Sequence, residues 1–254
     1  MLDVFLTALG IGGATAVGAA LGFLFKNPSH KFNDIILSFA AGVMLAAAVG
    51  GLILPSLEYG EGWGAVAVSV AGIFLGALAL NFIDKLVPHL HKMAGVDQES
   101  HPENTEKLNR VLLFVVAISI HNLPEGIAAG VSFGVEDNVM QAISVALGIA
   151  LQNIPEGMVI IAPMIAAGVS RRRTFIIALI TGAVEVVGTF IGYFAVSLSA
   201  AILPFALAFA GGTMLYVISD EMIPETHSHG AERGATYSLL LGFCFMLAFD
   251  FLLG

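Results

Sequence analysis

Hydrophobic residues are concentrated in eight long stretches of the chain, separated by short polar connections. Each stretch is close to the roughly 20 residues that an α-helix needs to cross about 30 Å of hydrocarbon. The stretches span residues 3–24, 34–57, 64–83, 111–133, 138–168, 174–198, 200–222 and 236–253. Because a segment in lipid must satisfy its own backbone hydrogen bonds, the pattern predicts an all-α integral membrane protein. We expect eight transmembrane helices in a single transmembrane domain over residues 1–254.

The basic residues lie in every second connection, while the other connections and both termini have none. They are Lys26 and Lys31 after the first stretch, Lys85, Lys92, Lys107 and Arg110 after the third, Arg171, Arg172 and Arg173 after the fifth, and Arg233 after the seventh. By the positive-inside rule these connections are cytoplasmic and both termini are extracytoplasmic. The longest, about residues 84–110, is predicted to be a cytoplasmic loop between the third and fourth helices. We expect a multi-pass plasma membrane protein of a prokaryotic inner membrane.

The composition agrees with lipid as the main solvent, since 57% of residues are hydrophobic, 11% are charged and the mean hydropathy is +0.92. Soluble domains carry about 25% charged residues. The single cysteine, Cys244, excludes a disulfide within the chain and any cysteine-based zinc or iron–sulfur site. A metal would therefore need His, carboxylate, amide or thioether ligands. We expect no nucleic-acid partner.

Three glutamates interrupt the apolar stretches near their middles: Glu125, Glu156 and Glu185. An ionised side chain at the centre of a bilayer costs about 2.5–3.5 kcal/mol on insertion scales, so such a residue indicates function. Other polar or sulfur-containing side chains are expected at the same depth, namely His121, Asn122, Gln152, Asn153 and Met44. A single Asn or Gln in such a helix commonly just bonds a neighbouring helix. The convergence of four stretches on one layer favours a binding site.

The fourth and fifth stretches carry similar motifs, HNLPEG (121–126) and QNIPEG (152–157). In each motif two ligand-type residues are four positions apart and project from one face of a helix. We call them the His121–Glu125 pair and the Gln152–Glu156 pair. The two helices run in opposite directions, so the pairs can face each other at the midplane. The prolines are expected to kink both helices, and paired interrupted helices are typical of transport sites.

A cation would offset the cost of burying the acids. Imidazole and thioether beside carboxylates suit divalent transition metals better than Ca²⁺ or Mg²⁺, which prefer oxygen ligands. We expect Zn²⁺ first, with Fe²⁺, Mn²⁺ and Cd²⁺ as alternatives.

The alternatives to a transporter are an enzyme within the membrane and a channel or sensor. An intramembrane metalloenzyme is disfavoured because HNLPE lacks the second histidine of H-E-x-x-H, so we predict that the protein is not an enzyme. A metal-selective channel or a metal sensor would use the same ligands, and the sequence alone does not separate these from a carrier.

The motifs HNLPEG, QNIPEG, GAVEVVG (182–188) and FAAGVMLAAAVGGLILPSLE (39–58) resemble the ZIP (Zrt/Irt-like) divalent metal transporter family, especially its prokaryotic GufA-like branch. The resemblance covers all eight stretches, and the paired PEG motifs are specific to that family. It implies metal uptake into the cytoplasm through a binuclear site. The first metal would take Met44, His121, Glu125, Gln152 and Glu156, and the second would take Asn122, Glu125, Asn153, Glu156 and Glu185. Some relatives have Asp where this chain has Asn153, which puts the second metal in doubt.

The resemblance also implies an elevator-type motion, in which the first, fourth, fifth and sixth helices move against the other four, and a homodimer. A release path on the cytoplasmic side would resemble the family's exit residues. Its candidates are Asp34, Asp84, His89, His91, Asp220, Glu221, Glu225, His227 and His229. Clustered His and acidic residues at a membrane surface can also be simply solvated, and both interpretations stay open at this point.

Overall fold

The computed structural model describes residues 1–25, 29–93, 104–133 and 139–253. Within its helices, side chains are described except at residues 84, 86–93, 104–114, 117, 200 and 253. The described ranges contain helices and no strand, which confirms the predicted all-α fold.

The helices form eight consecutive rods, each made of one helix or of several joined end to end. They are α1 (Leu2–Gly22); α2 (His30–Ala48) with η1 (Val49–Ile53) and α3 (Leu54–Glu58); α4 (Gly62–Met93); α5 (Asn104–Ser132); α6 (Val139–Ala166); α7 (Arg171–Leu198); η2 (Ala200–Ile202) with α8 (Leu203–Val217), η3 (Ile218–Met222) and α9 (Ile223–Thr226); and α10 (Glu232–Leu253). Over the described residues, seven rods are long and apolar enough to cross a membrane. The eighth, α5, contains the apolar stretch predicted at residues 111–133, and only part of its side chains is described.

One predicted connection is shorter than expected. Helix α4 continues to Met93 and α5 begins at Asn104, so helix occupies much of the loop predicted at about 84–110. Hydropathy reports only the part of a helix that lies in hydrocarbon. A helix satisfies its own backbone hydrogen bonds and can therefore continue into a polar sequence.

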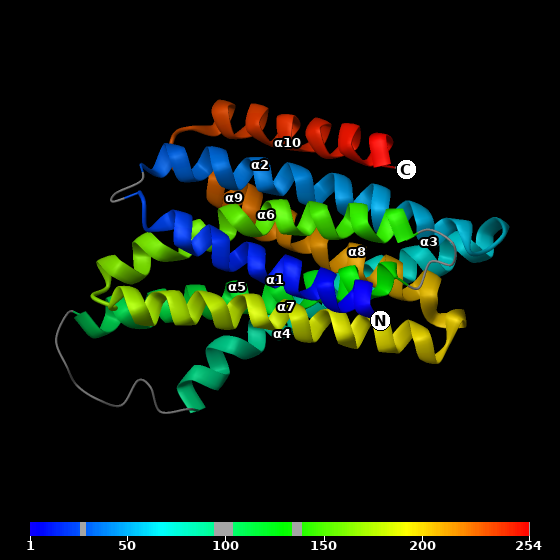
Figure 1. Cartoon of the computed structure of the whole chain (residues 1–254), viewed down its shortest axis with the longest axis horizontal. Coiled ribbons are helices and arrows are strands. Elements are labelled where there is room, and N and C mark those ends of the chain that lie inside the picture. Colours follow the sequence, from blue (N-terminus) through cyan, green and yellow to red (C-terminus); the bar gives the residue numbers. More distant parts are fainter. Residues whose placement is uncertain (26–28, 94–103, 134–138, 254) are drawn as a thin grey trace.

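The rods lie side by side along the long axis of the molecule, and both termini are at the same end, as an even number of crossings requires (Figure 1). The most extensive packing joins α5 to α7 and α1 to α6, and α1 also packs on α7. Separately, α2 packs along α10, and α4 along α8. We call α1, α5, α6 and α7 the motif group, and α2, α4, α8 and α10 the frame group. The two groups meet mainly where α2 contacts α6 and α5 contacts α8.

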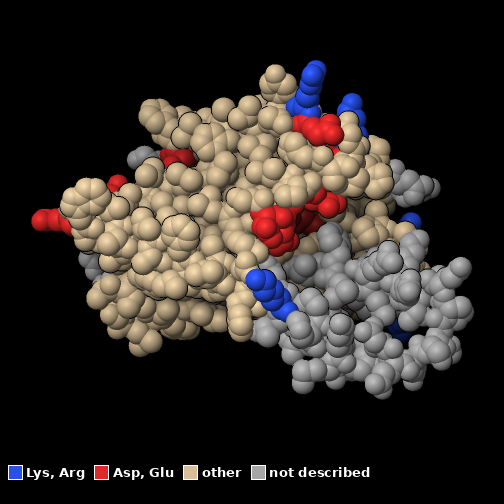
Figure 2. All heavy atoms as spheres, turned by 180° about the vertical axis from the view of Figure 1, so that it is seen from behind, with Lys and Arg blue, Asp and Glu red and all other residues tan. Residues whose placement is uncertain are grey.

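The outer surface carries large apolar side chains that a soluble protein would bury. Examples are Trp63, Phe74 and Phe82 on α4 and Phe251 on α10, all strongly exposed. Most of the described side chains visible on the face in Figure 2 are neither acidic nor basic. Exposed apolar surface of this extent is stable in lipid, so the chain is a multi-pass membrane protein.

Two rods contain a π-turn two residues before a proline. In η1 the Leu54 N–H bonds the Val49 carbonyl ahead of Pro55, and in η3 the Ile223 N–H bonds the Ile218 carbonyl ahead of Pro224. Proline lacks an N–H and crowds the carbonyl four residues earlier, so a wider turn relieves the conflict. The second π-turn carries Asp220 and Glu221 and therefore sets their direction. By contrast, α5 and α6 continue as α-helix through their PEG prolines.

Candidate metal site

The glycine of each PEG motif marks a point where another backbone crosses very closely. A Cβ atom on Gly126 would lie 2.2 Å from the Glu185 carbonyl oxygen, and one on Gly157 would lie 2.2 Å from the Thr15 carbonyl oxygen. Only glycine fits at such distances. These crossings bring Glu185 of α7 beside the HNLPEG motif and Thr15 of α1 beside the QNIPEG motif.

The two ligand pairs face each other across the interface of α5 and α6, as predicted from their antiparallel course. The charge of Glu156 interacts with His121, while Glu125 lies beside the Gln152 amide and close to the charges of Glu156 and Glu185. Each end of one pair therefore lies opposite an end of the other. Four of the predicted ligands are brought together in this way.

Glu185 is held by three side chains from three other helices. Its Oε1 accepts hydrogen bonds from Thr15 Oγ1 at 2.9 Å and from Asn122 Nδ2 at 2.8 Å. Its Oε2 accepts a hydrogen bond from Asn153 Nδ2. The amide of Asn122 also reaches the Thr181 carbonyl at 3.1 Å, and that of Asn153 reaches the Ile11 carbonyl at 3.0 Å. These donors fix the orientation of both amides.

Because their amino groups point at Glu185, both asparagines turn their oxygens elsewhere. Asn122 Oδ1 and Asn153 Oδ1 are buried and have no hydrogen-bond partner in the described part of the chain. The same holds for both oxygens of Glu125 and for the amide of Gln152, which lies beside Glu125 without completing a hydrogen bond of normal geometry. Buried oxygens without a proton donor are costly. A cation is the ligand that would satisfy such a set.

Thr15 was not among the residues predicted from the sequence. The only indication was a hydroxyl near the middle of an otherwise apolar stretch, which usually bonds its own helix. Gly126 and Gly157 were also missed as positioning residues, since a helical glycine does not reveal by itself what crosses it.

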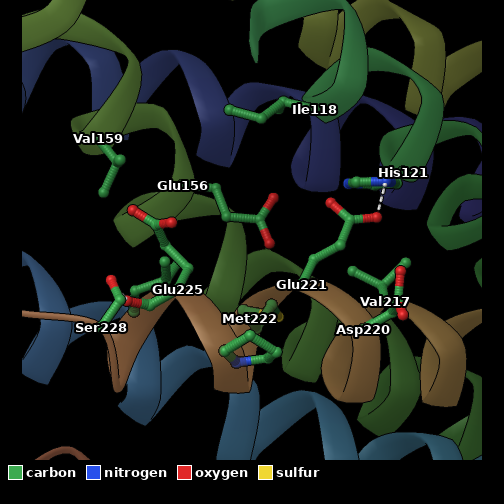
Figure 3. Close-up of a pocket in the computed structure, with 12 residues that line it drawn as sticks. Ile118, His121, Glu156, Val159, Val217, Asp220, Glu221, Met222, Glu225 and Ser228 are labelled. Atoms are coloured by element: carbon green, nitrogen blue, oxygen red, sulfur yellow. Dashed lines mark hydrogen bonds and ion pairs between the residues drawn. The ribbon is translucent and has the colours of Figure 1, made fainter. Parts of the chain in front are cut away.

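A cavity of about 550 Å³ leads from this site toward the end of α9. Its lining includes His121, Glu156, Asp220, Glu221, Glu225 and Ser228. His121 Nε2 lies 2.7 Å from Glu221 Oε1, and the carboxylates of Glu156 and Glu221 point into the same space (Figure 3). His121 thus already has an acidic partner from η3. A metal arriving at His121 would have to replace Glu221.

The remaining release-path candidates lie in different parts of the structure. His229 Nδ1 lies 3.1 Å from Oδ1 of the buried Asp34, and its ring stacks on His30, at the edge of the bundle. His227 bonds the Ile223 carbonyl at 2.8 Å and Thr236 Oγ1 at 3.0 Å. It does not line the cavity, so its placement in a path with Glu221 and Glu225 is not supported. The side chains of Asp84, His89 and His91 lie outside the described residues.

Met44 is completely buried, in an apolar cluster with side chains such as Ile149 and Met214. Its role as a sulfur ligand stays a prediction. Within the described part of the chain, no three His, Cys, Asp or Glu side chains converge as a ready-made metal site. Glu185 is engaged by three donors and His121 by Glu221. A metal that took these two side chains as ligands would have to replace those partners.

A family model described as ZIP Zinc transporter matches residues 94–250. The chain is 43% identical to the zinc transporter GufA of Myxococcus xanthus, over 96% of each chain. It is 39% identical to the zinc transporter ZIPB of Bordetella bronchiseptica, over 95% of this chain and 78% of that one. It is 32% identical to the zinc transporter ZIP11 of Homo sapiens, over 95% and 94% of the two chains.

Proposed function

The chain belongs to the ZIP family of zinc transporters, in its GufA-like branch, and from this premise we propose that it carries Zn²⁺ into the cytoplasm through the midplane site. The observation that carries this proposal is the set of buried oxygens without proton donors on Asn122, Glu125, Gln152 and Asn153. Together with the imidazole of His121 they form a mixed nitrogen and oxygen ligand set. Such a set suits a divalent transition metal better than Ca²⁺ or Mg²⁺.

The site is proposed to be binuclear, with Glu125 and Glu156 bridging. The first metal takes His121, Glu125, Gln152 and Glu156, with Met44 completing its shell. The second takes Asn122, Glu125, Asn153, Glu156 and Glu185. Glu125 supports this assignment, because it lies close to the charges of both Glu156 and Glu185.

Release is proposed to pass through the cavity toward the connection after α9. Glu221 contacts His121 directly, and Asp220 and Glu225 line the same space, so acids are available at successive positions. The connection after α9 leads to Arg233, and basic connections face the cytoplasm. With this orientation the cavity opens to the cytoplasm, so zinc would leave the site on the cytoplasmic side, which is uptake. Both termini would be extracytoplasmic, and the membrane is proposed to be a prokaryotic inner membrane.

Alternating access is proposed to occur by sliding of the motif group along the frame group, within a homodimer. The contacts support this division, since the most extensive packings, of α5 on α7, α1 on α6, α2 on α10 and α4 on α8, each lie within one group. A carrier of this kind should saturate with zinc and slow steeply on cooling. A rate that stays linear in zinc concentration and changes little with temperature would instead favour a channel.

The function is tested by zinc entry into proteoliposomes that contain a zinc-sensitive dye. Wild type should admit Zn²⁺, and His121→Ala should lower the initial rate by at least about 10-fold, because a metal ligand is lost. Tyr237→Ala, an exposed side chain on α10, serves as the control and should keep the wild-type rate. Uptake by His121→Ala at the wild-type rate would refute the site. Competition by Fe²⁺, Mn²⁺ and Cd²⁺ in the same assay ranks the metals.

Asn153→Asp tests the second metal. The substitution replaces the amide that donates to Glu185 and to the Ile11 carbonyl with a carboxylate facing both. We expect the metal-free protein to melt at a lower temperature, because like charges now meet in a buried site. Zinc should raise the melting temperature more than in wild type, and more metal should be bound per chain. Thermal melts with and without zinc, combined with elemental analysis, measure both effects.

Asn33→Asp, near the start of α2 and away from the site, is the matched control. It should leave the zinc-induced shift unchanged. If Asn153→Asp also left that shift and the metal content unchanged, Asn153 would not belong to a metal site.

A further inference from the structure

A second cavity, of about 350 Å³, lies between the motif group and the frame group. Its walls come from α4, α5, α7 and α8, and it shares no lining residue with the cavity that leads to His121. Ala79, Leu123, Pro124, Val184 and Phe209 mark its extent. Pro124 places it directly behind the HNLPEG motif, on the side of α5 turned away from the metal site.

The described lining of this cavity has no polar side chain whose proton is available to a polar ligand. Ser119 and Thr213 are the polar side chains among the lining residues described. Ser119 donates its proton to the Val115 carbonyl at 2.9 Å, and Thr213 donates its proton to the Ala210 carbonyl at 2.7 Å. A buried water needs two to four polar partners, and apolar cavities without them stay dry and accept apolar guests.

The mouth of the cavity is continuous with the surface that faces lipid. Ile83 lines the cavity and is itself 38% exposed. On α7, Ile180 and Val187 flank the lining residue Val184 at helical spacing, and both are strongly exposed. The medium at this mouth is therefore bilayer hydrocarbon.

We propose that this cavity binds one acyl chain of a bilayer lipid. Its volume is at the lower end of the range of ligand pockets, and an empty cavity would leave its lining atoms without van der Waals partners. The chain fills the gap between the two helix groups and packs against Pro124. The proposed lipid site follows from the cavity and its opening to the lipid-facing surface, and it does not depend on zinc transport.

The test uses liposomes in which the protein is reconstituted with a phospholipid bearing a photoreactive diazirine at the end of one acyl chain. After illumination, labelled peptides are mapped by mass spectrometry. We expect label on cavity-lining residues such as Leu123, Ile127 and Phe209, in addition to the outer surface. Label confined to outward-facing residues such as Phe82 would overturn the proposal without any reference to transport.

Ala79→Phe places a ring in the cavity and should remove most of the label from α5 and α8. Ala71→Phe adds the same ring at an exposed position of the same helix and should leave the label in place. Ala210→Leu fills the cavity from the opposite wall. If Ala79→Phe cannot be reconstituted into liposomes, the label is measured in Ala210→Leu instead. Undiminished label at Leu123 and Phe209 in the filled variants would also overturn the proposal.

Discussion

Glu125→Gln should take up zinc at least about 100-fold more slowly than wild type, yet should unfold at a higher temperature when no metal is present. Glu125 is proposed to bridge both metals, so losing its charge affects two sites at once. Changes to residues that merely support metal ligands already cost 10- to 100-fold in affinity or activity. The loss of a bridging ligand should reduce uptake by an amount at or beyond the upper end of that range.

The expected gain in stability follows from the absence of hydrogen-bond partners for the Glu125 carboxylate. Neither of its oxygens has a hydrogen-bond partner in the described structure, so the substitution breaks no hydrogen bond. It removes a charge from a depth where burial is expensive. A gain of about 1–3 kcal/mol is the expected order, which corresponds to a rise of several degrees in melting temperature. Zinc should no longer raise that temperature as it does in wild type.

Uptake into proteoliposomes and thermal melts with and without zinc measure the two effects. Glu58→Gln, the same change at an exposed position of α3, is the control and should alter neither. Wild-type uptake by Glu125→Gln would remove this residue from the site. Loss of uptake together with a lower metal-free melting temperature would show that Glu125 has a structural role instead.

Gly126→Ala should lose both stability and uptake, although it adds only a methyl group and changes no charge. The new Cβ would lie 2.2 Å from the Glu185 carbonyl oxygen and 2.9 Å from the Glu185 Cα atom. Backbone atoms cannot turn aside as a side chain can, so α5 and α7 must separate. Overpacking of this kind costs about 1–3 kcal/mol or more. The separation also pulls Asn122 away from Glu185.

Gly13→Ala on α1 is the matched control, because a Cβ at that position meets nothing within 4 Å. Alanine favours helix over glycine by roughly 1 kcal/mol, so this variant should be at least as stable as wild type and should transport normally. Melting temperature and initial uptake rate are the readouts. If Gly126→Ala matched Gly13→Ala in both, the close crossing of α5 and α7 would not be what positions Glu185.

The two principal variants differ in a way that a simple loss of folding would not produce. Glu125→Gln separates function from stability, because the charge that binds metal is a cost to the metal-free fold. Gly126→Ala couples function to stability, because the same close contact supports both. Their comparison distinguishes a residue that binds the metal from one that holds the binding residues in place.

The sequence by itself determined the all-helical membrane fold and the membrane-crossing stretches, and it predicted a common depth for the three glutamates. Hydropathy and helical spacing are local properties, so they can be read without knowing how helices pack. The opposed arrangement of the two PEG motifs was also predictable, since consecutive membrane helices run antiparallel and residues four apart share a face. The π-turns were not predicted, because a proline indicates a disturbed helix without specifying the form of the disturbance.

Only the tertiary structure decided which atoms meet. Thr15 reaches Glu185 across 170 positions of the chain, and Asn122 reaches it across 63. Such contacts depend on the rotation of each helix and on the crossings at Gly126 and Gly157. The pairing of His121 with Glu221, and the bonding of His227 to Ile223 and Thr236, have the same origin. The sequence predicted one depth for the candidate ligands, whereas close backbone contacts between distant helices decided how they face one another.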